Sequence, residues 1–127
     1  MLKDQQVGAV LPAQDIARAR AYYSEKLGLD PENPDDGDNL QYRCGDSTGF
    51  MVYQTSNAGT AKNTQMGWTV SDLKATVEEL RGKGVKFEDY DFPGLKTEDG
   101  IATMPDGNSA AWFLDSEGNI LSINQTG

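Results

Sequence analysis

The spacing of apolar residues along the chain predicts two strand–helix pairs. Residues 7–11 (Val-Gly-Ala-Val-Leu) form a short apolar run typical of a strand, and apolar positions then recur at helical spacing over residues 16–27. The same order returns later, with a strand-like run at 65–70 and helical spacing over residues 73–80. The chain therefore carries an internal repeat of a strand followed by a helix.

Residues at the ends of both predicted helices support this repeat. Asp15 and Asp72 each stand where an N-cap belongs, because an aspartate side chain can accept hydrogen bonds from the free amides of a first helical turn. Gly28 and Gly84 follow the last apolar positions and are expected to end the two helices as C-caps.

A hairpin pattern is repeated as well. Residues 46–53 (Asp-Ser-Thr-Gly-Phe-Met-Val-Tyr) match residues 115–122 (Asp-Ser-Glu-Gly-Asn-Ile-Leu-Ser), and strand-like residues precede both copies. The Asp-Ser-x-Gly segments are interpreted as turns in which glycine supplies a positive φ. The second copy has extra residues within 91–109, a stretch rich in Gly and Pro that predicts loop and short strand.

Together these repeats predict one α+β domain over residues 1–127. It is built from two βαβββ modules, and their sheets form a cup with the helices on the outside. Module one spans about 6–54, a polar linker covers 55–63, and module two spans about 64–125.

Composition excludes several classes of function. The chain has no histidine, which rules out Ser-His-Asp and Cys-His catalysis and metal sites that use imidazole. Cys44 is the only cysteine, so an intrachain disulfide cannot form. A net charge of −9 disfavours nucleic acid and anionic membranes as partners. The charge is explained by solubility alone, and attraction of a cationic ligand is the alternative interpretation.

Other local patterns indicate a soluble protein without a calcium loop. The first residues lack the apolar stretch of a signal peptide, so a cytoplasmic location is expected, with no membrane partner. The acidic segment 30–38 lacks the ligand spacing of an EF-hand and is expected to be a solvated loop.

Two segments resemble the vicinal oxygen chelate superfamily, which includes glyoxalase I, bleomycin resistance proteins and extradiol dioxygenases. Residues 15–29 (Asp-Ile-Ala-Arg-Ala-Arg-Ala-Tyr-Tyr-Ser-Glu-Lys-Leu-Gly-Leu) are similar to the opening of that family, and residues 111–121 (Ala-Trp-Phe-Leu-Asp-Ser-Glu-Gly-Asn-Ile-Leu) to its final hairpin. The resemblance covers about residues 7–124. It implies a homodimer, with cups formed within one chain or across two.

The resemblance also implies where a divalent metal ion would bind, through His or Glu side chains at equivalent positions of the two modules. These positions correspond here to Gly8, Tyr53, Gln65 and Ser122, none of which is a good ligand for a divalent cation. We therefore expect no metal site of the family's usual kind and no cofactor. The family's metal-free members often bind a small molecule in the same cup, and some sequester antibiotics.

Strand alternation predicts which side chains line such a cup. Two-residue turns at Ser47-Thr48 and its equivalent would place Cys44 opposite Met51 and Phe113 opposite Ile120. A bulge in these turns would instead replace Cys44 by Arg43. The candidate ligand-binding residues form a mostly apolar lining with a few polar points: Tyr42, Cys44, Met51, Tyr53, Gln65, Thr69, Phe113 and Ser122.

The same lining is also consistent with a filled core. Glycines at inward positions, Gly8 and Gly67, favour open space, whereas Trp68 and Trp112 alternate to the opposite face and are predicted to pack against the helices.

Three functions remain open. The first is a metal-free protein that binds a small organic molecule, such as an aromatic or cationic compound, with sequestration of an antibiotic as one form. The second is a metal-independent lyase, isomerase or other enzyme acting on a small carbonyl compound, with Tyr53, Gln65 and Ser122 orienting the carbonyl and Glu98 or Asp99 as base. The third is a domain with a collapsed cup that serves in assembly or regulation.

Overall fold

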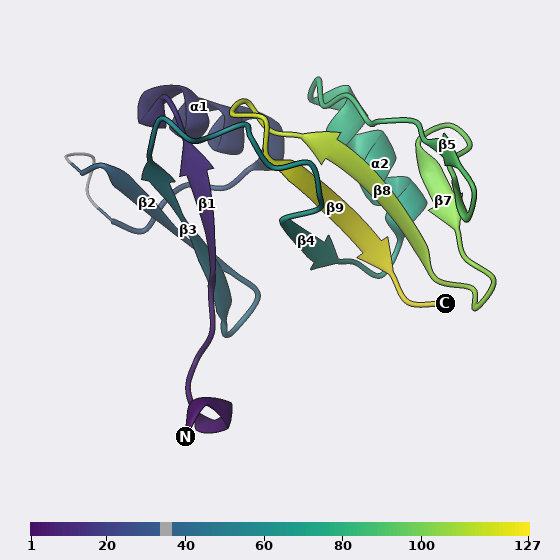
Figure 1. The fold of residues 1–127 in the computed structure, drawn as a ribbon, viewed down its shortest axis with the longest axis horizontal. Coiled ribbons are helices and arrows are strands. Elements are labelled where there is room, and N and C mark those ends of the chain that lie inside the picture. Colours follow the sequence, from purple (N-terminus) through teal and green to yellow (C-terminus); the bar gives the residue numbers. More distant parts are fainter. Residues whose placement is uncertain (34–36) are drawn as a thin grey trace.

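The computed structural model describes residues 1–33 and 37–127, so residues 34–36 of the acidic segment lie outside the description. The first module follows a short 3-10 helix, η1 (Leu2–Asp4), at the N-terminus (Figure 1). Its sheet has the order β1-β3-β2, with β1 parallel and β2 antiparallel to β3. The elements of this module are β1 (Ala9–Ala13), α1 (Ile16–Leu27), β2 (Asn39–Cys44) and β3 (Thr48–Gln54).

The second module repeats this arrangement with additions. Its sheet has the order β4-β9-β8-β7, and β4 runs parallel to the last strand, β9, as β1 does to β3. The added residues between helix and final hairpin form the small β5–β6 hairpin and β7, within the stretch predicted as loop and short strand. The elements are β4 (Met66–Thr69), α2 (Leu73–Gly82), β5 (Asp91–Phe92), β6 (Leu95–Lys96), β7 (Ile101–Thr103), β8 (Ser109–Leu114) and β9 (Ile120–Gln125).

Both helices begin at the predicted residues. The Asp15 side chain accepts a hydrogen bond from the Arg18 amide at 3.0 Å, and the Asp72 side chain accepts one from Ala75 at 3.0 Å. Gly28 is the C-cap of α1 in the left-handed conformation, with φ 70°. Helix α2 ends one residue earlier than predicted, with Lys83 as C-cap and Gly84 next at φ 94°.

A single core lies between the sheets and the helices, which sit on the same side of both sheets in Figure 1. Aromatic rings connect the modules through this core: Phe50 of β3 meets the Trp68 ring of β4 edge-on at 6.0 Å, and Trp68 stacks with Phe113 of β8 at 6.4 Å. The α+β fold class with two such modules is confirmed. No helix in the described part of the chain is long and apolar enough to cross a membrane.

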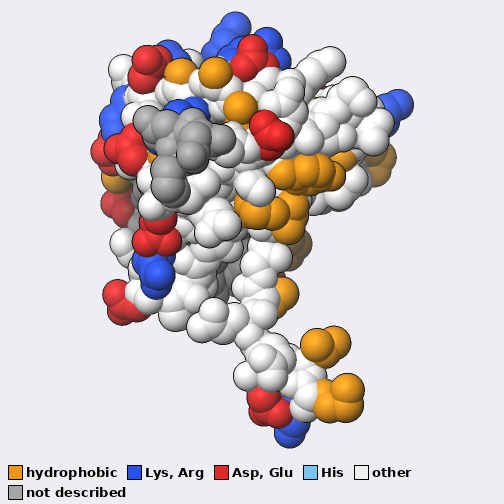
Figure 2. Space-filling model, turned by 90° about the vertical axis from the view of Figure 1, so that its left-hand side faces the viewer, with side chains coloured by type: hydrophobic (Ala, Val, Ile, Leu, Met, Phe, Trp, Pro, Cys, Tyr) orange, Lys and Arg blue, Asp and Glu red, His pale blue; other side chains and the backbone are white. Residues whose placement is uncertain are grey.

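The opposite face of the two sheets, here called the open face, turns away from the helices and exposes apolar side chains. Val10 of β1 is 54% exposed and Tyr53 of β3 is 41% exposed. Figure 2 shows hydrophobic side chains gathered along one side of the molecule and at the tip of the projecting N-terminal segment. In that segment Leu2 and Val7 are almost fully exposed.

Candidate functional site

The open face holds four of the eight predicted ligand-binding residues. Met51 and Tyr53 alternate with the buried Phe50 and Val52 along β3, so they point away from α1. In module two, Thr69 and Ser122 share this face, on neighbouring strands β4 and β9. Tyr53 and Thr69 are exposed, Met51 is half-buried and Ser122 is buried. Their role in binding a ligand stays a prediction.

Three predicted residues lie on the other side of the sheets. Asn39 pairs with Tyr53 and Gln41 with Met51 across β2 and β3, a register three residues away from the predicted one. Because a shift by an odd number exchanges the faces of a strand, Tyr42 and Cys44 turn toward the helices. The cause is the turn, in which Gly45 rather than Gly49 takes the positive φ, at 63°.

In the β8–β9 hairpin the observed register also differs from the predicted one, here by one residue. Leu114 pairs with Ile120, and the loop between them, residues 115–119, is longer than the predicted two-residue turn. Phe113 therefore pairs with Leu121 and is fully buried in the helix-side core. Trp112 is shifted to the face of its partner Ser122, so the prediction that Trp112 packs toward the helices is wrong. Trp68 does pack there, against Phe113.

Gln65 is occupied by structural hydrogen bonds. Its Nε2 donates to Asn119 Oδ1 at 3.0 Å, and its Oε1 accepts from the Ile120 amide at 2.9 Å. Both ends of the side-chain amide are used to fix the start of β4 beside the β8–β9 loop. This arrangement fixes the Gln65 side chain in a structural role and leaves only its second Nε2–H as a donor.

An aromatic cluster of Tyr90, Phe92 and Trp112 was not anticipated. Tyr90 lies between the other two rings, with its centroid 5.5 Å from Phe92 and 5.5 Å from Trp112. Phe92 is 56% exposed, and Trp112 shares the face of Ser122. The sequence does contain two aromatic residues close together, in Tyr90-Asp91-Phe92. The surrounding Gly- and Pro-rich composition predicts a loop, so these residues are not predicted to form a cluster.

The four positions that would carry the family's metal ligands do not form a metal site. Val10 and Gly67 occupy equivalent positions, each five residues before the N-cap of the following helix. Val10 pairs with Met51 and Gly67 pairs with Ser122, so the strand register makes Met51, rather than Tyr53, the counterpart of Ser122. Met51 lies two residues before Tyr53 and points to the same face of β3, and it is no better a ligand for a divalent cation. Among residues 1–33 and 37–127, no three His, Cys, Asp or Glu side chains gather closely enough to hold a metal ion. The side chains at these positions therefore do not fit a divalent metal ion.

The space expected beside Gly67 is already filled. A Cβ atom at this position would collide with the Ser122 hydroxyl and come within 2.7 Å of Asn124 Nδ2. The Asn124 amide also donates to Ser122 Oγ at 3.0 Å. In module two the glycine therefore accommodates neighbouring side chains, as the filled-core interpretation predicts.

The two acidic residues considered as bases differ in position. Asp99 lies beside Arg81 of α2, with 3.5 Å between its Oδ2 and Arg81 Nη1, which directs it to the helix side. Glu98 lines a shallow cavity with Lys96, Ile101 and Thr103 at the edge of module two. Neither position supports a base acting between Tyr53 and Ser122.

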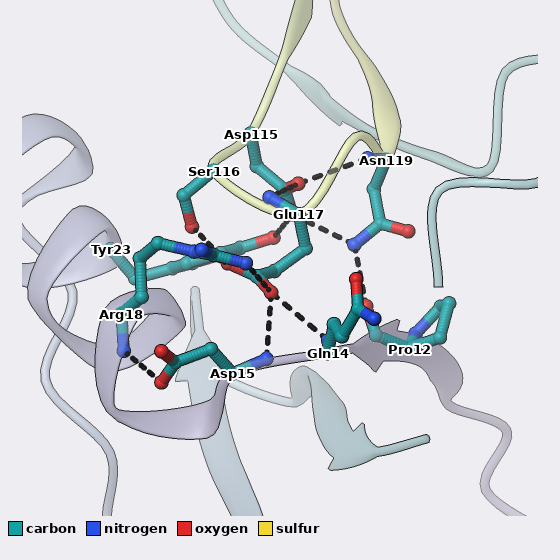
Figure 3. A network of polar contacts seen from close by, with 9 residues as sticks. All are labelled: Pro12, Gln14, Asp15, Arg18, Tyr23, Asp115, Ser116, Glu117 and Asn119. Atoms are coloured by element: carbon teal, nitrogen blue, oxygen red, sulfur yellow. Dashed lines mark hydrogen bonds and ion pairs between the residues drawn. The ribbon is translucent and has the colours of Figure 1, made fainter. Parts of the chain in front are cut away.

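A polar network joins the two modules beneath the start of α1 (Figure 3). The Glu117 carboxylate, fully shielded from solvent, accepts hydrogen bonds from the amides of Gln14 and Asp15, both at 2.9 Å. It also accepts from Arg18 Nε at 2.8 Å and from Ser116 Oγ at 2.8 Å. Burial by itself raises the pKa of Glu117, but these hydrogen bonds outweigh it and hold the pKa at about 2.

The same loop anchors its other residues to module one. Tyr23 donates its hydroxyl to Asp115 Oδ2 at 2.7 Å, and Asn119 Nδ2 donates to the Pro12 carbonyl at 2.9 Å. Burial, followed by the nearby Asp115 charge, raises the pKa of Tyr23, so its hydroxyl stays a donor. We call residues 115–119 with these partners the inter-module clamp. The turn pattern predicted the loop but not its partners.

Comparison with known proteins identifies the fold. No protein-family model and no curated protein matches the sequence. Among solved structures, a glyoxalase/bleomycin resistance protein from Catenulispora acidiphila is 19% identical, covers 98% of this chain and 100% of its own, and superposes with a TM-score of 0.69.

Two other solved structures show the range of proteins with this fold. TnmS3, an antibiotic-binding protein from Streptomyces sp. CB03234, is 19% identical with a TM-score of 0.64, over 98% of both chains. A lactoylglutathione lyase from Agrobacterium tumefaciens is 17% identical with a TM-score of 0.67, over 96% of this chain and 93% of its own. These likenesses confirm the resemblance at the level of the fold: the chain has the same fold as these glyoxalase/bleomycin resistance structures.

Proposed function

We propose that this protein binds a small organic molecule on its open face without a metal ion. The observation that carries the proposal is the open face itself, where Met51, Tyr53 and the aromatic cluster offer apolar surface beside a few polar groups. The positions that hold a metal ion in related proteins carry no ligand side chains here. An antibiotic-binding protein with the same fold supports this class of function.

A second copy of the chain is the expected cover for this face. Val10 and Tyr53 expose apolar surface on the neighbouring strands β1 and β3, and Leu2 and Val7 are almost fully exposed. Figure 2 shows hydrophobic side chains at the tip of the projecting N-terminal segment. Soluble proteins rarely leave contiguous apolar surface uncovered, and such patches mark interfaces. A homodimer would bury these side chains and would enclose a cup between the open faces.

An aromatic or cationic ligand suits the groups available. The faces of Tyr53, Tyr90 and Trp112 attract cations through their negative π-electron density, and flat aromatic compounds can stack on them. A net charge of −9 raises the local concentration of cations around the whole protein.

Ligand binding is tested by a thermal-shift screen followed by calorimetry. We expect aromatic cations such as benzyltrimethylammonium to stabilise the protein, and Tyr53→Ala to weaken binding at least several-fold. Thr60→Ala, in the polar segment between the modules, is the control and should bind as the wild type does. If no aromatic or cationic compound stabilises the fold, or if Tyr53→Ala binds unchanged, the open-face site is wrong.

Metal content and assembly are tested on protein purified without a His-tag. Elemental analysis should find no stoichiometric divalent ion; finding one would contradict the metal-free proposal. In sedimentation velocity the wild type should be a dimer. Val10→Lys should give monomers because it places a charge in the apolar contact, whereas Glu78→Lys on the outer face of α2 should leave the dimer intact. A wild type that stays monomeric at high micromolar concentration would remove the second copy from the proposal.

A further inference from the structure

A groove lies on the helix side of the molecule, at the junction of the two modules, and is separate from the open face. The end of β2 and the residues after α1 border it from module one, and β4 and α2 border it from module two. Its volume is about 400 Å³. Pockets that take small organic ligands span roughly 300–1,000 Å³, so this groove suits a compound of modest size.

Most of the lining is apolar. Leu27, Leu80 and Ile123 supply aliphatic surface, and Trp68 and Phe113 present a pair of stacked rings with planes 13° apart. Because Phe113 is fully buried and part of the core, it gives this wall a fixed position. A flat apolar molecule could lie against the half-buried Trp68 ring, which Phe113 supports from the core.

The charges around the groove favour an uncharged ligand. Among the described residues, Arg43 is the only charged one in the lining; its side chain is 60% exposed, and its Nε pairs with Glu32 Oε2 at 3.0 Å. Burying an unpaired charge of either sign against apolar walls is costly, so an ion would gain nothing here that compensates for its loss of water.

One polar group in the groove has a poor partner. Trp68 donates its indole N–H to the sulfur of Cys44 at 3.5 Å, and a cysteine sulfur is a weak acceptor. An oxygen acceptor on a bound molecule would make a stronger hydrogen bond with the same N–H. A carbonyl or ether oxygen fits this requirement without adding charge.

We propose that this groove is a second ligand site, for an uncharged aromatic compound that carries a carbonyl or ether oxygen. The ring system lies against Trp68, which Phe113 holds in place, and the oxygen accepts the hydrogen bond of the indole N–H in place of Cys44. Most of its walls are helix-side residues of both sheets, although Thr69, which the open face shares, also borders the groove. Tyr53 does not line the groove, so it distinguishes this site from the proposed open-face function.

Cys44 provides the test, since it is the only cysteine of the chain and lines the groove. The probe is 2-acetylnaphthalene, a neutral aromatic ketone, and naphthalene-2-carboxylate is its charged counterpart. The rate at which a disulfide reagent modifies Cys44 should fall about tenfold at a ketone concentration of about ten times Kd, because only the free fraction reacts. The carboxylate should give little protection.

Variants separate this site from the open face. Thr76→Phe fills the groove from α2 and should abolish ketone binding, whereas Lys74→Phe places the same ring on an exposed position of α2 and should not. Trp68→Phe keeps an aromatic wall but removes the donor, and it should weaken binding about five- to tenfold. Tyr53→Ala should bind the ketone normally.

Several results would overturn the proposal. They are failure of the ketone to bind up to its solubility limit, binding that leaves Cys44 as reactive as before, and equal or tighter binding of the carboxylate. Normal ketone binding by Thr76→Phe would also refute it. If Thr76→Phe does not fold, the protection of Cys44 in the wild type decides the question alone. Loss of ketone binding in Tyr53→Ala would assign the compound to the open face instead.

Discussion

Glu117 offers the sharpest test of how the two modules are held together. Its carboxylate lies at the centre of the inter-module clamp and accepts hydrogen bonds from two backbone amides, the Arg18 guanidinium and the Ser116 hydroxyl. Glu117→Gln keeps the size of the side chain but removes the charge, and its amide nitrogen cannot accept from the surrounding donors. The substitution therefore isolates the electrostatic part of the clamp.

The magnitude follows from the pKa of Glu117. A pKa of about 2 in the folded protein, against an ordinary value of 4.5, corresponds to about 3 kcal/mol of stability at neutral pH. Because the folded pKa is the lower one, this contribution is complete above about pH 4.5 and is lost as the pH falls toward 2. Glu117→Gln should therefore cost about 3 kcal/mol at pH 7 and much less near pH 2.5.

Urea unfolding followed by tryptophan fluorescence at several pH values measures both quantities. The wild type should lose stability between pH 4.5 and 2 more steeply than Glu117→Gln. Glu79→Gln is the matched control, because Glu79 is 71% exposed and its pairing with Lys83 is long, at 4.0 Å. A cost below about 1 kcal/mol for Glu117→Gln at pH 7, with an acid limb parallel to that of the wild type, would refute this reasoning.

Three further substitutions, with Gly8→Ala as a control, test the packing of the fold. Gly49→Ala should destabilise the protein by about 2 kcal/mol in chemical denaturation, because the added Cβ would collide with the Tyr42 carbonyl. Gly8→Ala should be nearly neutral, because the nearest atom to its added Cβ is 3.6 Å away. Equal effects of the two substitutions would be inconsistent with the register of β2 and β3. Asn119→Ala should lower the free energy of unfolding by about 2–3 kcal/mol, since it leaves the Pro12 carbonyl and Gln65 Nε2 without their hydrogen-bond partner. A decrease under about 0.5 kcal/mol would mean that water replaces the Asn119 side chain. Tyr42→Phe should raise the melting temperature slightly, because the buried Tyr42 hydroxyl has no hydrogen-bond partner in the described part of the chain; a clear drop would reveal one.

The sequence was most informative where a local interaction determines the structure. Asp15 and Asp72 cap helices because the capping bond forms within one turn, and the two helical repeats need only their own apolar spacing. The order of elements and the two-module fold follow from these signals. The positions of Met51, Tyr53, Thr69 and Ser122 on one face required only the alternation of a strand.

Prediction failed where hairpin register had to be known. The similarity between Asp46-Ser47-Thr48-Gly49 and the later turn suggested a positive φ at Gly49, but Gly45 adopts it, and the faces of Tyr42 and Cys44 exchanged as a result. The roles of Gln65 and Glu117 were also out of reach, because their partners lie far away along the chain. Long-range polar contacts leave no periodic signal in a single sequence.

The inter-module clamp has a consequence for the order in which this chain can fold. The amides of Gln14 and Asp15 at the start of α1 bind a carboxylate that follows them by 103 and 102 residues. During synthesis the first helix therefore leaves the ribosome long before the group that completes its N-terminus exists. Contacts this distant in sequence form slowly and only after much of the chain entropy is lost. Module one should remain incompletely ordered until the β8–β9 hairpin has been synthesised, so formation of this hairpin is the step that commits the whole domain to its fold.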